Sequence, residues 1–260
     1  MEVVIVADED AAARISAGIV ERLLTDKPAA VIGVATGSSP INTYRRLVEA
    51  YDAGRISFAD AHIVLLDEYV GLAPDHPQRY RRFVHDHLVD HVDVPTGHVH
   101  APDVDADDLN AAGPRYEALL ADLGGVDLQL LGIGSDGHVG FNEPGSSLRS
   151  RTRIKTLTAA TREDNARFFD HPDDVPRHVM TQGLATIGDA RHLVLLACGA
   201  AKAAPVAAAV EGPLTTSCPA SILQWHPHVT VVIDEDAASG LANVAYYRET
   251  HEGKPPWQHY

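Results

Sequence analysis

Residues 128–144 read Leu-Gln-Leu-Leu-Gly-Ile-Gly-Ser-Asp-Gly-His-Val-Gly-Phe-Asn-Glu-Pro, a short apolar run that passes directly into a polar segment rich in glycine. The first four residues have the length and character of a strand buried on both faces of a parallel sheet. Comparable runs bounded by turn residues occupy residues 3–6, 30–34, 63–66, 193–197 and 229–233. The sequence therefore predicts six buried strands spread along the chain.

Helical patterns lie between these runs. Apolar residues share one helical face in residues 41–51 and again in residues 116–123. Alternation of strand and helix predicts a doubly wound, mostly parallel, Rossmann-like α/β sheet with helices on both faces, in one domain over residues 1–260. Ligands of such sheets bind beyond the carboxyl ends of the strands, so the residues that follow each strand are the candidates for function.

Composition narrows the classes of partner. The chain has 21 Lys and Arg against 36 Asp and Glu, and a formal net charge of −15 argues against nucleic acid or an anionic membrane surface as the main partner. No apolar run approaches the roughly 20 residues of a membrane span, and the opening segment breaks at Asp8 before a signal peptide could form. Two cysteines, Cys198 and Cys218, fit a reduced cytoplasmic protein.

The loop after the second predicted strand is a candidate anion site. It reads Ala-Thr-Gly-Ser-Ser-Pro over residues 35–40, before a helix that starts at Ile41. Pro40 suits a first helical position and Ser39 suits the cap before it, and exposed amides at a helix start bind anions readily. An ordinary serine-capped turn is an equal alternative, because the loop lacks the lysine of a nucleotide-binding loop.

Two acids follow the third predicted strand, in Asp67-Glu68-Tyr69. Strand ends in this position face the binding crevice, where a carboxylate could remove a proton from a carbon next to a carbonyl. Consecutive residues of a strand point to opposite sides, so at most one of the two acids is expected to be the base. The alternative is that either acid caps the next segment.

The loop after residues 128–131 invites two interpretations. Gly132, Gly134 and Gly137 spell Gly-x-Gly-x-x-Gly, but the motif lies mid-chain and residues 149–158 contain no acid that could bind a ribose, so a dinucleotide site is rejected. Instead, we expect the glycines to let a polar loop bend tightly around a small ligand.

Asp136, His138 and Glu143 lie within eight residues of this same loop. Flanking carboxylates fix the tautomer of an imidazole and raise its basicity, which favours a catalytic histidine over a structural one.

Residues 134–144 closely resemble the signature of the glucosamine-6-phosphate deaminase family. Further similar motifs follow in the family's order, at residues 36–40, 66–72, 150–156, 219–224 and 226–227. The resemblance implies an isomerase-deaminase of amino sugar catabolism, which converts glucosamine 6-phosphate and water to fructose 6-phosphate and ammonia without a metal or organic cofactor. It also implies that Asp67 carries the proton between C2 and C1. His138 would help open the sugar ring, with Asp136 and Glu143 orienting it.

The resemblance extends to a phosphate site and a lid. Gly37, Ser38 and Ser39 would bind the phosphate together with Arg167 and Lys202, although either cation alone could be an ordinary surface charge. Residues 158–188 would form a mobile lid that excludes water.

Some relatives are activated by N-acetylglucosamine 6-phosphate at a subunit interface. Arg153, Lys155 and Thr156 match part of that site, whereas its C-terminal part has no clear match, so an activator and a homo-oligomer both stay open. The chain departs from the family in carrying Arg79 where serine is common.

Two other functions compete with deamination. The first is hydrolysis by a 6-phosphogluconolactonase, a related family with a similar Asp-Gly-His loop, which the Phe-Asn-Glu-Pro ending disfavours. The second is a sugar-phosphate sensor domain without catalysis. Six histidines between His76 and His100 could suggest a metal, but His85 and His87 fall on different helical faces and are not expected to share one.

Overall fold

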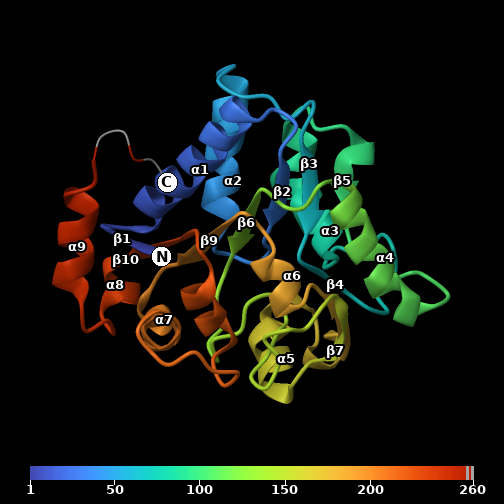
Figure 1. The fold of residues 1–260 in the computed structure, drawn as a ribbon. Coiled ribbons are helices and arrows are strands. Elements are labelled where there is room, and N and C mark those ends of the chain that lie inside the picture. The colour runs from blue at the N-terminus through green and yellow to red at the C-terminus, as the bar shows by residue number, and fades with distance from the viewer. Residues whose placement is uncertain (256–257, 259–260) are drawn as a thin grey trace.

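The computed structural model describes residues 1–255 and 258 and is built around a seven-stranded sheet (Figure 1). Its strands are β1 (Glu2–Val6), β2 (Val31–Val34), β3 (His62–Leu65), β5 (Val99–His100), β6 (Leu128–Leu131), β9 (His192–Ala197) and β10 (Val229–Asp234). All neighbouring strands are parallel. The six predicted strands and the doubly wound parallel sheet are confirmed, and the two-residue β5 is an addition.

The strand order, β1-β10-β9-β6-β2-β3-β5, places a switch point between β2 and β6. The chain runs outward from β2 to β3 and β5, and then returns to β6 on the other side of β2. Only two residue pairs join β2 to β6, Ile32 with Leu128 and Gly33 with Gln129, whereas four pairs join β6 to β9. A Cβ at Gly33 would lie 2.0 Å from the side-chain oxygen of Gln129, so a larger residue at this seam would displace that buried side chain.

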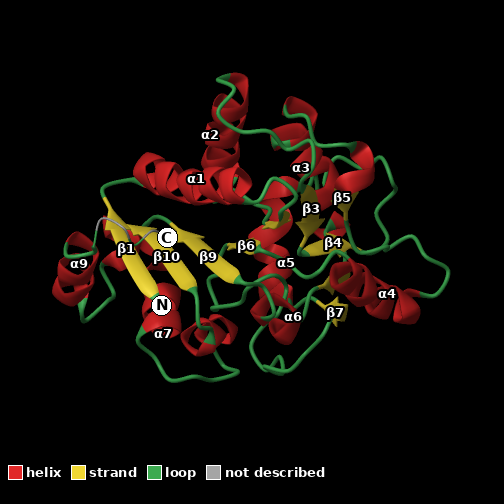
Figure 2. Ribbon diagram, turned by 45° about the horizontal axis from the view of Figure 1, so that its top comes forward, coloured by secondary structure: helices red, strands yellow, loops and turns green. Residues whose placement is uncertain are grey.

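Helices cover both faces of the sheet. They are α1 (Glu9–Asp26), α2 (Ile41–Asp52), α3 (Tyr80–His87), α4 (Leu109–Asp122), α5 (Ala159–Asn165), α6 (Leu184–Gly188), α7 (Ala203–Val210), α8 (Glu235–Ala238) and α9 (Val244–Glu252). Figure 2 shows α1 and α2 on one face and α7 on the other. The predicted helices are confirmed in α2 and α4. The irregular tail expected from residue 252 begins where α9 ends, and residues 256, 257, 259 and 260 lie outside the described residues.

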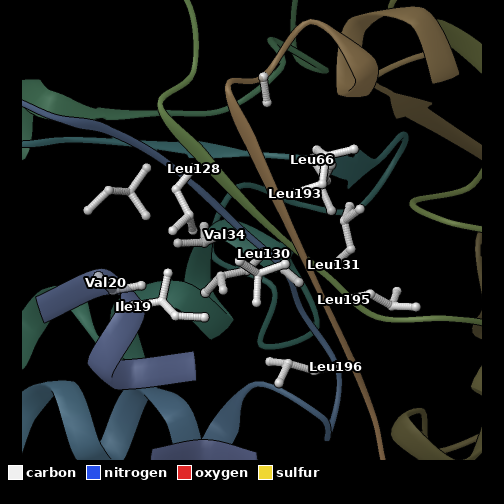
Figure 3. Close-up of a cluster of buried hydrophobic side chains, with 14 of the residues drawn as sticks. Ile19, Val20, Val34, Leu66, Leu128, Leu130, Leu131, Leu193, Leu195 and Leu196 are labelled. Carbon is white, nitrogen blue, oxygen red and sulfur yellow. The ribbon is translucent and has the colours of Figure 1, made fainter. Parts of the chain in front are cut away.

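The core lies between the sheet and its helices. Figure 3 shows Ile19 and Val20 of α1 beside leucines of β6 and β9, all of them buried. Burying such a side chain stabilises the fold by roughly 1.5–3 kcal/mol. Because β6 and β9 are buried on both faces, their carboxyl ends are fixed platforms for the loops that follow.

A second, three-stranded antiparallel sheet was not expected. It consists of β4 (Asp67–Tyr69), β8 (His178–Thr181) and β7 (Arg153–Thr156), with β8 in the middle. Thr181 is paired with Asp67 on one side and with Arg153 on the other. The expected loop after β3 is therefore partly a strand, and its register determines where Asp67 lies.

No helix in the described part of the chain is both long enough and apolar enough to cross a membrane.

Candidate active site

A cavity of about 700 Å³ opens at the carboxyl ends of β2 and β6, where the two halves of the sheet meet. Of the residues that the sequence predicts for the site, it is lined by Gly37, Ser38, Ser39, Asp67, His138, Arg167 and Lys202. These residues come from segments up to 165 positions apart. The doubly wound topology brings them together, in the place where such sheets bind ligands.

The loop between β2 and α2 contributes glycine and two serines to the cavity. Gly37 has a φ of 89°, which only glycine adopts without strain, and so the loop can turn tightly. The prediction that Ser39 caps the helix is wrong. The cap residue is Pro40, whose carbonyl accepts a hydrogen bond from the Tyr44 amide, and no side chain caps this helix. Ser38 and Ser39 both lie at the cavity instead.

Asp67 is the buried acid of the site, with 5 % of its surface exposed. Burial, with a further contribution from the charge of Glu68, raises the pKa of Asp67 to about 8. A carboxylate with so high a pKa is a much stronger base than one in water. This supports the prediction that Asp67 handles a proton.

Glu68 faces the other way and has a structural role. Its carboxylate accepts hydrogen bonds from the backbone amides of Tyr69, Tyr80 and Arg81, and the last two begin α3. Burial raises the pKa of Glu68, and these amide bonds oppose that rise. Glu68 is therefore the acid that caps the next segment, as the alternative prediction allowed. Asp67 is the one carboxyl of the pair that lines the cavity.

His138 is held by Asp136. The Nδ1 atom of the imidazole lies 2.6 Å from Oδ1 of Asp136, and that oxygen also accepts the backbone amide of His138. Burial alone would raise the pKa of Asp136, but the hydrogen bond and charge of His138 lower it below its ordinary value. The pairing keeps the proton on Nδ1 and leaves Nε2 free to exchange protons.

Gly134 makes room for this imidazole. A Cβ at position 134 would lie 2.2 Å from Cε1 of His138, a separation that no packing tolerates. Gly134 is therefore not part of a nucleotide-binding motif. It lets the His138 ring pack against the backbone of the loop that contains both residues.

Among the described residues, no hydrogen bond or ion pair joins Glu143 to His138. Its Oε1 accepts hydrogen bonds from the amide and hydroxyl of Thr158, at 3.0 and 2.9 Å, and from the hydroxyl of Thr161. Only 4 % of Glu143 is exposed, and such a carboxylate must find donors nearby. The expected orientation of His138 by Glu143 is thus corrected: Glu143 anchors the start of α5 to the end of the glycine-rich loop.

Two cations lie at the same cavity. Arg167 belongs to a short 3-10 helix after α5 (Ala166–Phe168), and its guanidinium stacks 4.7 Å above the Phe168 ring. Lys202 follows β9, and its Nζ donates to the Ile133 carbonyl at 2.7 Å. Burial, and then the nearby charge of Arg167, lower the pKa of Lys202. Mutual repulsion of two cations is relieved by an anion, so the arrangement suits a phosphate group.

The predicted lid, residues 158–188, divides into two parts. Residues 158–169 include α5 and border the cavity. The later part forms β8 and α6, where Met180, Leu184 and Ile187 are fully buried. Buried strands and helices open only with large parts of the fold, so motion of the lid is a prediction for residues 158–177 alone.

The residues matched to an activator site lie away from the cavity, on β7. Arg153 donates a hydrogen bond to the side-chain oxygen of Asn142 at 2.8 Å, which connects β7 to the glycine-rich loop. Lys155 and Thr156 pair with β8 through their backbones.

The histidine-rich segment forms no metal centre among residues 1–255 and 258. His85 lies 2.8 Å from a carboxylate oxygen of Asp90 rather than sharing a site with His87. The rings of His98 and His100 stack on His62 at the sheet edge. Asp105, in the loop between β5 and α4, forms an ion pair with Arg79.

Two features of the site were not predicted from the sequence. Tyr69, Tyr80, Phe141 and Phe169 form an aromatic wall of the cavity, with neighbouring ring centroids 4.9–5.9 Å apart. Asp164 reaches the cavity from α5. No periodic pattern connects residues from such distant segments. One local signal does exist: Thr158 has the residue type and spacing of a helix cap, and its hydroxyl accepts a hydrogen bond from the Thr161 amide. It indicates where α5, the helix that carries Asp164, begins.

Comparison with known proteins gives consistent results. Residues 7–232 match the family described as "Glucosamine-6-phosphate isomerases/6-phosphogluconolactonase". The chain is similar to glucosamine-6-phosphate deaminases of Rhodococcus opacus (strain B4), with 54 % identity, and of Mycolicibacterium smegmatis, with 55 % identity, over 99 % of each chain. A solved monomeric glucosamine-6-phosphate deaminase is 42 % identical, with a TM-score of 0.90 over 92 % of this chain and all of that one.

A solved 6-phosphogluconolactonase from Trypanosoma brucei gives a TM-score of 0.73 over 93 % of this chain and 98 % of that one. At 21 % identity, this likeness shows a shared fold and no more.

Proposed function

Because this chain belongs to the family of glucosamine-6-phosphate isomerases and 6-phosphogluconolactonases, we propose that it is a glucosamine-6-phosphate deaminase. It converts glucosamine 6-phosphate and water to fructose 6-phosphate and ammonia. The observation that carries the proposal is that one cavity contains two separate acid-base groups beside two cations. These groups are the buried carboxyl of Asp67 and the imidazole of His138, which is hydrogen-bonded to Asp136. The chemistry needs both groups, because ring opening and carbon proton transfer occur at different atoms.

The phosphate of the substrate occupies the end of the cavity lined by Arg167 and Lys202. Ser38 and Ser39, with the backbone around Gly37, supply neutral donors from the opposite loop. Charge-assisted hydrogen bonds to phosphate are roughly twice as strong as neutral ones, so this end fixes the position of the sugar.

His138 opens the sugar ring. With its Nδ1 proton directed at Asp136, the imidazole transfers protons through Nε2. A proton reaches the ring oxygen as the bond between that oxygen and C1 breaks, and the hydroxyl on C1 loses its proton. The product is the open-chain aldehyde, with the amino group still on C2.

Asp67 then moves a proton between carbons. Its carboxylate removes the proton from C2, which is acidified by the neighbouring aldehyde, and the aldehyde oxygen gains a proton as the double bond between C1 and C2 forms. The same carboxyl group then returns its proton to C1, and the nitrogen on C2 loses a proton as the double bond between C2 and nitrogen forms. The product is an imine at C2. Water adds to C2, the C2–N bond breaks, and ammonia leaves a ketone, so the atoms of substrate and water are all accounted for.

The segment 158–169 closes the cavity against bulk water during these steps. Glu143 anchors its start, and Arg167 at its other end contacts the phosphate. Exclusion of water protects the intermediate and strengthens each charge interaction inside.

Three finer assignments belong to the same proposal. Arg153, Lys155 and Thr156 are the candidate site for an activating sugar phosphate, the chain is a candidate homo-oligomer, and it acts in the cytoplasm. The first is supported by the hydrogen bond from Arg153 to Asn142 of the glycine-rich loop. Light scattering of the purified protein measures the second, and a solved relative is described as monomeric.

Enzyme assays test the proposed function directly. Purified protein is given glucosamine 6-phosphate and, in parallel, 6-phosphogluconolactone, with release of ammonia and hydrolysis of the lactone as the two readouts. We expect ammonia release with little lactone turnover. Lactone hydrolysis without ammonia release would replace the proposal with the lactonase, and neither activity with retained sugar-phosphate binding would favour a sensor.

A further inference from the structure

Asp164 is an acid placed where the substrate's phosphate is expected. It lies in the last turn of α5, and its side chain lines the same cavity as Arg167 and Lys202. Asp164 and Arg167 are three residues apart in continuous helical structure, a spacing that puts two side chains on one face. A negative charge at this end of the cavity opposes the binding of a dianion.

A hydrogen bond holds Asp164 in this place. The Ser135 hydroxyl donates to Oδ2 of Asp164 at 2.8 Å. Ser135 belongs to the loop after β6, next to Asp136, so this contact joins that loop to α5 across the mouth of the cavity.

The charge of Asp164 reaches the cations of the cavity without pairing closely with them. The pKa of Lys202 is lowered by burial and by Arg167, while Asp164 and Asp136 act in the opposite direction. Among the described residues, no ion pair within 4.0 Å joins Asp164 to either cation. Asp164 is therefore a nearby counter-charge that a ligand can replace.

We propose that Asp164 is the internal counter-ion of Arg167 and Lys202 and that it competes with the phosphate group of the substrate. Its carboxylate, held by Ser135, offsets the two cations before an anion binds. When a phosphate dianion enters, the same cations contact the ligand, and the remaining charge of Asp164 weakens its binding. The identity of the ligand as a sugar phosphate rests on the proposed function, whereas the competition with an anion does not.

Binding of inorganic phosphate tests this inference without catalysis. Its Kd is measured by isothermal titration calorimetry at constant ionic strength for the wild-type enzyme, Asp164→Asn, Ser135→Ala and Glu163→Gln. Glu163 is the matched control, since it is an exposed acid of the same helix that does not line the cavity. Circular dichroism and melting temperature report on the folding of each variant.

We expect Asp164→Asn to tighten phosphate binding by roughly three- to tenfold, the order of magnitude for removing one like charge from the lining of a partly solvated cavity. Glu163→Gln should change the Kd by less than about twofold, because Glu163 does not line the cavity and solvent screens its charge from the bound anion. Ser135→Ala leaves the charge in place and should give no tightening. The KM for glucosamine 6-phosphate should fall in Asp164→Asn by a similar factor.

Three results would overturn the inference: an unchanged Kd in folded Asp164→Asn, an equal gain in Glu163→Gln, or a full gain in Ser135→Ala. The last would assign the effect to the hydrogen bond instead of the charge. A wild-type enzyme that releases no ammonia would refute the proposed function, and the phosphate titrations would still decide the role of Asp164.

Discussion

Replacing Asp67 by asparagine should change how stability depends on pH, as well as stop catalysis. The carboxyl group is buried, and its pKa in the folded protein is about 8, against 3.8 for an ordinary aspartate. A group that binds its proton more tightly in the folded state favours folding at low pH, and this stabilisation is lost as the pH rises from about 4 to 8. The asparagine side chain cannot ionise, so the variant lacks this loss.

The size of the effect follows from the pKa shift. One pKa unit corresponds to about 1.4 kcal/mol, so a shift from 3.8 to about 8 makes the ionised Asp67 side chain cost the fold about 5–6 kcal/mol at high pH. Roughly 1.7 kcal/mol of this cost is already present at pH 5. Between pH 5 and pH 9, the stability of Asp67→Asn relative to wild type should therefore rise by about 4 kcal/mol.

Urea denaturation of both proteins at pH 5, 6, 7, 8 and 9 measures this difference. The contributions of the other titrating groups to the free energy of unfolding cancel in the difference, because both proteins share those groups. The exposed Asp60→Asn serves as the control, with an expected change near zero. In wild type, kcat/KM should rise toward pH 8, because only the ionised base accepts a proton from carbon. Asp67→Asn should lose isomerisation and keep its affinity for inorganic phosphate.

A stability difference that stays flat with pH would refute the reasoning, because it would mean that Asp67 titrates as an ordinary exposed acid. Near-normal turnover by the variant would show that another group moves the proton.

Three other substitutions test the site. Gly134→Ala should displace the His138 ring from its carboxylate and lower kcat by at least about tenfold, as ammonia-release kinetics would show, whereas Gly18→Ala, with open space at its Cβ position, should leave kcat unchanged. Glu143→Gln should weaken the anchor of α5, raising KM and speeding proteolysis within residues 158–177; an unchanged cleavage rate would count against the anchor. Arg79→Ser should break the ion pair to Asp105 and lower the free energy of unfolding, measured by urea denaturation, by about 1–3 kcal/mol. A loss below about 0.5 kcal/mol, which is typical of a surface substitution, would contradict this prediction.

Six strands of the large sheet were predictable because each lies in a mostly apolar run, whereas the two-residue β5 is too short to give such a signal. The small sheet was not, because its strands are three or four residues long and include Asp67 and Arg153 among their members. Their pairing partners lie in β8, more than 20 residues from β7 and more than 100 from β4. Such pairing is decided by the tertiary structure, which no local pattern records.

Seven residues predicted from the sequence line the cavity, but most of the contacts around it were not predictable. The pairing of Asp136 with His138 is local, two residues apart, and was foreseen. The partner of Glu143 was assigned wrongly, because proximity in sequence favoured His138 while the fold brings two threonines of the next helix within reach. Likewise, Ser135 and Asp164 are 29 residues apart, and only the folded chain shows that they meet.

The seam between β2 and β6 has a mechanical consequence. Two residue pairs hold the halves of the large sheet together there, and the loops that leave these two strands border the same cavity. A ligand that touches both loops therefore acts as a removable crosslink between the halves. Amide hydrogen exchange at residues 31–34 and 128–131 should slow when the cavity is filled, and the force needed to pull β2 from β6 should rise with ligand concentration.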